Sequence, residues 1–153
     1  LSEELVDGYR STADGYIAKN MPLIENGELK NFIVSRYGAA RTRLKRSDSD
    51  GGCYIMNGGG TSLSDIIKNT KKGLLMNRFS AGSPGVNGDV TGVAKNSFLI
   101  ENGQIVGAVS ETMFSGNLTE MLMNVKAISS ECINDGSCIL PWVDFGGVTV
   151  SGK

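Results

Sequence analysis

Histidine is missing from this chain of 153 residues. Because histidine is the commonest general base near neutral pH and the commonest zinc ligand, the usual hydrolase sites that depend on it cannot be assembled from this chain alone. The three cysteines, Cys53, Cys132 and Cys138, form no C-x-x-C pair, a pattern that fits reduced thiols in a cytoplasm. We therefore predict no catalytic, cofactor-binding or metal-binding residue within the chain.

Two further classes of function also lack support. No segment approaches the roughly 18 consecutive apolar residues that a membrane-spanning helix needs, and no secretion signal opens the chain. The 15 Lys and Arg residues nearly balance the 16 Asp and Glu residues, so the net charge of −1 gives no dominant attraction to nucleic acid or membranes. We expect a cytoplasmic protein that binds no membrane, with nucleic acid an unfavoured partner.

Glycine, in contrast, is abundant, with 21 residues, and it ends a pentapeptide that occurs twice. Leu-Ile-Glu-Asn-Gly occupies residues 23–27 and 99–103, and a second apolar run follows each copy. Asn-Gly accepts positive φ at both central positions of a two-residue turn, so the copies predict β-hairpins over residues 21–37 and 94–110. Because the copies diverge beyond the pentapeptide, we interpret them as two similar turns and not as an internal repeat.

Helix signals are fewer than strand signals. Ser62 followed by Asp65 predicts the start of one helix. Lys71 and Lys72 suit its last turn, and Gly73 predicts its end. Shorter helical patterns occupy residues 2–6 and 38–44.

A second clear helix is predicted to begin at Asn117, with Glu120 in its first turn. Its apolar face consists of Leu118, Met121, Leu122 and Val125. Together these patterns predict an α+β fold with a mainly antiparallel sheet or a barrel-like core and two to three helices. The length fits a single domain over residues 1–153, with two small, closely associated domains as the alternative. Since the chain starts at Leu1 and not at Met, we expect it to be part of a longer protein.

Two stretches have a binding interpretation beside a structural one. Gly58, Gly59 and Gly60 precede the helix at Ser62, where backbone N–H groups can bind a phosphate, but no P-loop lysine follows, so a turn and a capped helix are favoured. Six cations stand close together with Glu28 as the only nearby acid: Lys30, Arg36, Arg41, Arg43, Lys45 and Arg46. They could contact nucleic acid or an acidic partner, but a solvated helix face or a subunit contact is favoured.

The nucleophiles and carboxylates give no complete catalytic pattern. Without histidine, a cysteine or serine nucleophile would need Lys, Asp or another chain as its base, so buried structural thiols are the favoured interpretation of all three cysteines. Glu101 lies in a predicted turn and is expected to be solvated. Glu111 ends a strand just before a helix, where a side chain can point into a cleft, although a surface carboxylate is favoured.

Read as one block, residues 73–128 resemble the C-terminal half of the TldD/PmbA family, whose members were once described as modulators of DNA gyrase. The resemblance rests on Gly-Leu-Leu-Met-Asn-Arg-Phe at 73–79, Gly-Asp-Val-Thr at 88–91, Phe-Leu-Ile-Glu-Asn-Gly-Gln-Ile at 98–105 and Glu-Thr-Met-Phe-Ser-Gly-Asn-Leu at 111–118. Residues 136–153 are also similar to the family, and residues 21–41 match with looser spacing. The order of several motifs makes this resemblance more specific than any one of them.

The resemblance implies a metallopeptidase-like system. Family members pair an N-terminal α/β part with a C-terminal β-rich part, and they assemble as homodimers or as TldD–TldE heterodimers. They are linked to the maturation of peptides and the breakdown of small unfolded ones. The TldD-type subunit carries zinc on an HExxxH helix in its N-terminal part, helped by a cysteine near the C-terminus, whereas PmbA/TldE-type subunits lack this motif.

This chain departs from the zinc-binding pattern because it has no histidine and hence no HExxxH helix. Cys138 lies in the region of the zinc-binding cysteine, but the residues around it look more like the PmbA-type ending, so the ligand role is not assigned to it. We expect the C-terminal domain of a metallopeptidase, with zinc elsewhere in the full-length protein or in its partner. This domain would shape a cleft for a peptide or unfolded polypeptide and contribute a subunit interface. The alternative is a non-catalytic TldE-like partner subunit or a regulatory domain of the DNA-gyrase-modulator type.

Overall fold

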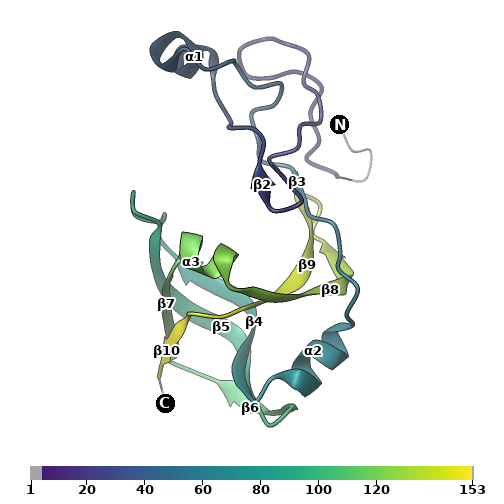
Figure 1. The fold of residues 1–153 in the computed structure, drawn as a ribbon, viewed down its shortest axis with the longest axis vertical. Helices are drawn as coiled ribbons and strands as arrows, with labels where there is room; N and C mark the ends of the chain where they lie inside the picture. The colour runs from purple at the N-terminus through teal and green to yellow at the C-terminus, as the bar shows by residue number, and fades with distance from the viewer. Residues whose placement is uncertain (1–4, 153) are drawn as a thin grey trace. The chain divides into compact units, whose positions relative to one another are not determined.

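The chain forms two compact units in a computed structural model that describes residues 5–152. Within this range, unit 1 contains residues 5–56 and 133–140, and unit 2 contains residues 57–132 and 141–152 (Figure 1). The described residues include three helices, and most strand pairs are antiparallel, so the predicted α+β class is confirmed. Because the sheets do not close into a barrel, the structure agrees with the first of the two predicted cores, the antiparallel sheet. None of these helices is long and apolar enough to cross a membrane.

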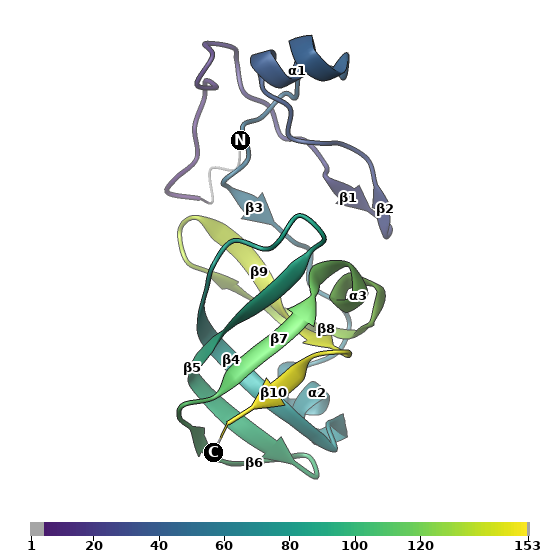
Figure 2. The same ribbon diagram turned by 90° about the vertical axis from the view of Figure 1, so that its left-hand side faces the viewer.

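Unit 2 is built on an antiparallel sheet with the strand order β10–β7–β5–β4 and with β6 also paired to β5. Its strands are β4 (Lys72–Ala81), β5 (Asp89–Glu101), β6 (Gln104–Val109), β7 (Met113–Asn117) and β10 (Thr149–Ser151). Figure 2 shows β7 between β5 and β10. The 13 residues of β5 allow it to pair with β7 along its first part and with β6 along its last part, while β4 follows its other side.

Both Asn-Gly turns are confirmed. Asn26 and Gly27 have φ values of 52° and 79°, and Asn102 and Gly103 have φ values of 48° and 80°. The second turn joins two long strands, β5 and β6. The first joins only two-residue strands, β1 (Ile24–Glu25) and β2 (Glu28–Leu29), so the hairpin expected over residues 21–37 is much shorter than its sequence pattern suggests.

Helix α2 (Leu63–Asn69) begins as predicted, because the side chain of Ser62 accepts a hydrogen bond from the backbone N–H of Asp65 at 3.1 Å. It ends earlier than predicted. Thr70 is already extended, and its carbonyl accepts the N–H of Gly103 from the β5–β6 turn at 2.9 Å. This long-range contact ends the helix before the two lysines, and Gly73 lies within β4 instead of stopping the helix.

Helix α3 (Leu118–Met123) also begins as predicted. The side-chain oxygen of Asn117 accepts the backbone N–H groups of Thr119 and Glu120 at 3.0 and 3.3 Å. None of the residues of this helix is buried, and Leu122 is 59% exposed. Met121 is half-buried beside Gly116, whereas Leu122 is left exposed. Val125, which was also predicted for this apolar face, belongs instead to strand β8 (Val125–Asn134).

The core of unit 2 lies where β5 meets β7. Phe114 is only 6% exposed, and its ring packs edge-on against Phe79 with 5.6 Å between ring centroids. Gly92 makes room for this ring, since a methyl group there would lie 2.8 Å from the Cε1 atom of Phe114. Ala94 and Ile100 on β5 are also buried, so the long central strand supplies much of the core.

Strands β8 (Val125–Asn134) and β9 (Cys138–Phe145) join β3 (Tyr54–Ile55) in a three-stranded sheet of order β3–β9–β8. The pairing of β3 with β9 is parallel. Ser129 on β8 is fully buried, and its hydroxyl donates to the Glu131 carbonyl at 2.6 Å and accepts the Trp142 N–H at 2.8 Å. The hydrogen-bonding capacity of this buried hydroxyl is thus used within unit 2.

Unit 1 contains little regular structure beyond helix α1 (Arg36–Thr42), which lies close to the predicted 38–44. Side chains hold its loops together. The hydroxyl of Tyr9 pairs with the Ser49 hydroxyl at 2.7 Å, donates to the Gly51 carbonyl at 3.0 Å and accepts the Asp50 N–H at 2.8 Å. Of the helix expected over residues 2–6, residues 2–4 lie outside the described residues and residue 6 is in a turn.

Candidate functional site

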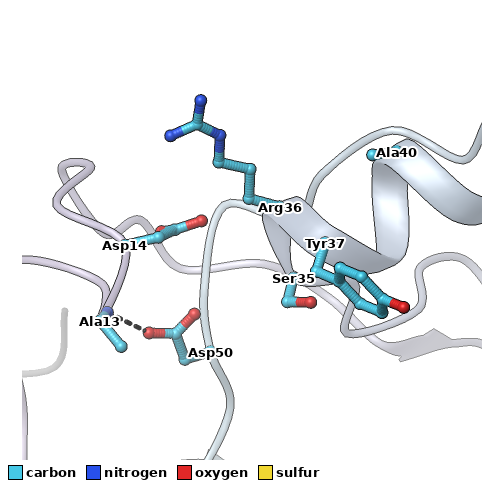
Figure 3. A pocket seen from close by; sticks show the side chains of 7 residues that line it. All are labelled: Ala13, Asp14, Ser35, Arg36, Tyr37, Ala40 and Asp50. Atoms are coloured by element: carbon cyan, nitrogen blue, oxygen red, sulfur yellow. Dashed lines mark hydrogen bonds between the residues drawn. The ribbon is translucent and has the colours of Figure 1, made fainter.

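An open pocket of about 520 Å³ lies in unit 1 between helix α1 and two loops. It is lined by Ala13, Asp14, Ser35, Arg36, Tyr37, Ala40 and Asp50, which Figure 3 labels. Two carboxylates thus come from loops 36 residues apart, and the start of α1 supplies the other wall. Both aspartates precede a glycine, so in the sequence they look like turn residues, and nothing local predicts that they meet.

Asp14 is tied to its surroundings through one carboxylate oxygen. Its Oδ1 atom accepts the Thr12 hydroxyl at 2.6 Å and lies 3.5 Å from the Arg46 guanidinium, which also stacks over the Tyr16 ring at 4.0 Å. The Thr12 hydrogen bond and the charge of Arg46 lower the pKa of Asp14 below its ordinary value, although burial opposes the shift. The carboxyl group is therefore ionised at neutral pH.

Asp50 and Ser35 are also used to hold the backbone. The Oδ2 atom of Asp50 accepts the Ala13 N–H at 2.6 Å, and the Ser35 hydroxyl accepts the Gly38 N–H at 3.1 Å as the N-cap of α1. Figure 3 shows the Arg36 guanidinium extending away from both carboxylates. The polar side chains of this pocket thus form hydrogen bonds that hold the two loops and the start of α1.

The outer edge of β4 is a second candidate. In the described sheet, β4 pairs only with β5, so its other side carries main-chain groups without a partner strand. Ala94 donates its N–H toward β7, to the Thr112 carbonyl at 2.9 Å. Its partner on β4, Phe79, consequently points its own N–H and carbonyl away from β5, and so does Ala81 two residues later.

Residues 77–81 on this edge are all exposed, and β4 contains no proline. An unprotected strand edge readily accepts another strand, and proteins normally block such edges. The sequence signal for this site is the segment Leu74–Phe79, whose apolar residues are typical of a strand. Its position at the edge of the sheet could not be predicted, because it depends on which distant strands fail to pair with it.

The glycine-rich segment before α2 does not form an anion site. The carboxylate of Glu131 on β8 accepts the Leu63 N–H at 2.9 Å and so occupies the start of the helix. This hydrogen bond lowers the pKa of Glu131. A phosphate would meet a fixed negative charge there, which supports the predicted turn and capped helix.

The six clustered cations divide into two groups. Lys30 pairs with Glu28 at 2.5 Å, and Arg46 pairs with Asp14. The remaining four are exposed on or just after α1, and none of them forms an ion pair within residues 5–152: Arg36, Arg41, Arg43 and Lys45. The favoured interpretation as a solvated helix face fits these four residues.

The three cysteines are free thiols, and none of them is buried. Cys132 is exposed, while Cys53 and Cys138 are half-buried, so the expectation of buried thiols is wrong. The reason is that Cys132 lies near the exposed end of β8, not on a covered face. Within the described part of the chain, no three Cys, Asp or Glu side chains gather in a way that could hold a metal ion.

Glu101 and Glu111 are both exposed, as the favoured interpretation of each predicts. Glu111 has a positive φ of 51° in the connection between β6 and β7. It does not line the pocket of unit 1.

Comparison with known sequences gives a consistent result. The family model described as the PmbA/TldA metallopeptidase C-terminal domain matches residues 3–152. Metalloprotease PmbA of Escherichia coli O157:H7 is 28% identical over 154 residues, which cover 94% of this chain and 34% of that protein. A metalloprotease of Methanocaldococcus jannaschii is 27% identical over 164 residues, covering 91% of this chain and 35% of the relative. The chain thus spans about a third of the length of these relatives.

Solved structures show the same fold. A Bacteroides thetaiotaomicron protein, named for a proposed role as modulator of DNA gyrase, matches 97% of this chain and 34% of its own with a TM-score of 0.83 and 24% identity. TldE from Thermococcus kodakarensis matches 94% of this chain and 36% of its own with a TM-score of 0.75 and 25% identity. At 24% identity the first likeness concerns the fold alone.

Proposed function

Because this chain belongs to the PmbA/TldA metallopeptidase C-terminal domain family, we propose that it is the C-terminal domain of a longer peptide-cleaving protein. Relatives named as metalloproteases support a metal-dependent reaction. Since the chain contains no histidine, the proposed metal, zinc, is held outside it, by the rest of the protein or by a partner subunit. The role of this domain is then to position the substrate.

The observation that carries the proposal is the open edge of β4. An extended peptide that adds to a strand edge is held by main-chain hydrogen bonds, with little regard to its sequence. Such binding suits unfolded polypeptides, whose main chain is free to pair. Phe79 and Ala81 direct their main-chain groups to this edge, and the exposed Phe79 side chain offers the peptide an apolar contact.

We further propose that the protein works in the cytoplasm as a homodimer or as a TldD–TldE type heterodimer. The likeness to TldE supports such an assembly. The exposed apolar residues Leu122 and Met123 of α3 are of the kind that a subunit interface covers. The three unpaired cysteines are consistent with a reducing compartment.

A second candidate function is a non-catalytic TldE-like subunit or a regulator of the DNA-gyrase-modulator type. The four unpaired cations on and after α1 favour the regulator, because exposed Lys and Arg clusters attract polyanions such as DNA. A salt-dependent binding assay with duplex DNA tests the regulator. Absence of binding at low salt would remove that function, while binding that weakens steeply with salt would support it.

The main proposal is tested with the full-length protein, alone and with its partner subunit. Unfolded peptides are offered with and without a zinc chelator, and the products are identified by mass spectrometry. We expect cleavage that the chelator abolishes and that added zinc restores. Cleavage that ignores the chelator would contradict a metallopeptidase, and a complete lack of cleavage would favour the non-catalytic subunit.

A further inference from the structure

We infer that Asn26 is a site of spontaneous deamidation, whereas the same dipeptide at Asn102 is protected by its contacts. In this reaction the backbone nitrogen of Gly27 attacks the Cγ atom of Asn26. A new C–N bond forms, the Cγ–Nδ2 bond breaks, and the Nδ2 group leaves as ammonia with the amide proton of Gly27. Water then opens the resulting succinimide to an aspartyl or isoaspartyl residue, and no other reagent is needed.

The two copies of Leu-Ile-Glu-Asn-Gly form the same turn, so local conformation does not distinguish them. Ring closure, however, requires the glycine nitrogen to be available and the turn to open. Both requirements depend on neighbouring groups, which the two copies do not share. The chain therefore contains its own matched comparison.

The turn at Asn102 is held by unit 2. Asn102 donates its N–H to the Lys71 carbonyl at 2.7 Å, and Gly103 donates its N–H to the Thr70 carbonyl at 2.9 Å. Gly103 also packs so closely that a methyl group there would lie 2.5 Å from the Lys68 carbonyl oxygen. The attacking nitrogen is thus engaged, and the turn cannot open without breaking these contacts.

The turn at Asn26 has no such support. Within residues 5–152, the backbone N–H groups of Asn26 and Gly27 find no acceptor. A methyl group on Gly27 would meet nothing within 4 Å. The flanking strands are two residues long, and their apolar residues Ile24 and Leu29 are 55% and 54% exposed. Opening such a short exposed hairpin costs little free energy.

Two further Asn-Gly dipeptides are restrained by neighbouring groups. Gly88 donates its N–H to the Gly85 carbonyl at 2.9 Å, which engages the nitrogen that would attack Asn87. Gly58, which follows Asn57, lies against β8, where a methyl group would be 3.0 Å from the Ser130 carbonyl oxygen. Among these sites, the turn at Asn26 is the most accessible to the reaction.

Deamidation at Asn26 would have a defined local effect. It places a new carboxylate between Glu25 and Glu28, and the isoaspartyl product adds a carbon to the main chain of a two-residue turn. Both changes weaken the β1–β2 hairpin.

The test uses the full-length protein, incubated at mildly alkaline pH and analysed by peptide mapping. Conversion raises the mass of the affected peptide by about one unit, and fragment ions locate the residue. Because two hydrogen bonds hold the Asn102 turn, we expect Asn26 to convert about tenfold faster in the native protein. In denaturant the two rates should converge, since both copies share the same sequence from Leu to Gly.

Equal native rates, or faster conversion at Asn102, would overturn the inference. So would a difference that persists unchanged in denaturant, because sequence and not structure would then be its cause. The variant Asn26→Gln serves as a control for peak assignment. It should abolish the mass change in the peptide that contains residue 26 and leave the slower conversion at Asn102 unaltered.

Discussion

Unit 2 and unit 1 are stabilised in different ways. Unit 2 has long paired strands and a core in which Phe114 and Ile100 are buried. Unit 1 has two-residue strands, and its loops are joined by side-chain hydrogen bonds such as those of Tyr9 and Ser47. The repeated pentapeptide appears in both units with the same turn. The strands beside the turn are short in unit 1 and long in unit 2. The turn therefore follows from local sequence, while the length of its strands depends on distant neighbours.

The largest effect on unit 2 is expected from Gly92→Ala. A methyl group there would lie 2.8 Å from the Phe114 ring, the Ala81 Cβ atom and the Ser80 carbonyl oxygen. Such overpacking should lower the free energy of unfolding by about 1–3 kcal/mol, which denaturant titration would measure. Gly107→Ala is the matched control, because nothing lies within 4 Å of that position. Similar effects of the two substitutions would show that the sheet is not closely packed at Gly92.

In unit 1 the largest loss of stability is expected from removing the hydroxyl group of Tyr9. Tyr9→Phe removes hydrogen bonds to Ser49, Asp50 and Gly51. We expect a loss of about 1–2 kcal/mol in stability, seen as faster amide exchange in unit 1. Tyr37→Phe removes a hydroxyl from a side chain that is 75% exposed and should change nothing measurable. If both variants exchange like the wild type, side-chain hydrogen bonds do not hold unit 1.

Asn117 has two structural roles, and a pair of variants separates their effects on stability. Its Oδ1 atom caps α3, and its Nδ2 group donates to Asp89 and to the Asn87 carbonyl at 2.9 Å each. Asn117→Ala removes both roles and should cost about 1–2 kcal/mol, measured by thermal unfolding. Asn117→Ser keeps a capping oxygen and should recover part of the loss. A serine variant as unstable as the alanine variant would mean that the tie to residues 87–89, and not the cap, accounts for the effect.

The smallest effect is expected on the pH dependence of stability. The Leu63 N–H lowers the pKa of Glu131 below its ordinary value of 4.5, so ionised Glu131 stabilises the fold above that value, and this contribution is lost as pH falls through the folded-state pKa. Glu131→Gln should therefore flatten the acid limb of the stability curve below pH 4.5. Glu101→Gln is the control, because the exposed side chain of Glu101 forms no hydrogen bond within residues 5–152, and it should leave that limb unaltered. Parallel curves for the wild type and Glu131→Gln would contradict the assignment.

Local features of the fold could be predicted from the sequence. The Asn-Gly turns, the Ser62 and Asn117 caps and the α+β class depend on residues within a few positions of one another, and the structure confirms them. The end of α2 could not be predicted, because the β5–β6 turn sets it through Thr70.

The candidate site was predictable only in part. The family motifs indicated a metallopeptidase domain, and the matching family model confirms that membership. The meeting of Asp14 with Asp50 and the free edge of β4 both depend on contacts between distant segments, and no local pattern encodes them. For the same reason the exposure of Cys132 was missed, since the cover of a strand face depends on the rest of the fold.

Peptide binding at the β4 edge is tested by measuring the affinity of the full-length protein for an unfolded peptide when this edge is altered. Ala81→Pro removes an N–H that faces away from β5, whereas Ala81→Ser keeps it. Since one main-chain hydrogen bond is lost, we expect the Kd of Ala81→Pro to rise about three- to tenfold and that of Ala81→Ser to match the wild type. Equal affinities of the two folded variants would contradict peptide binding at this edge.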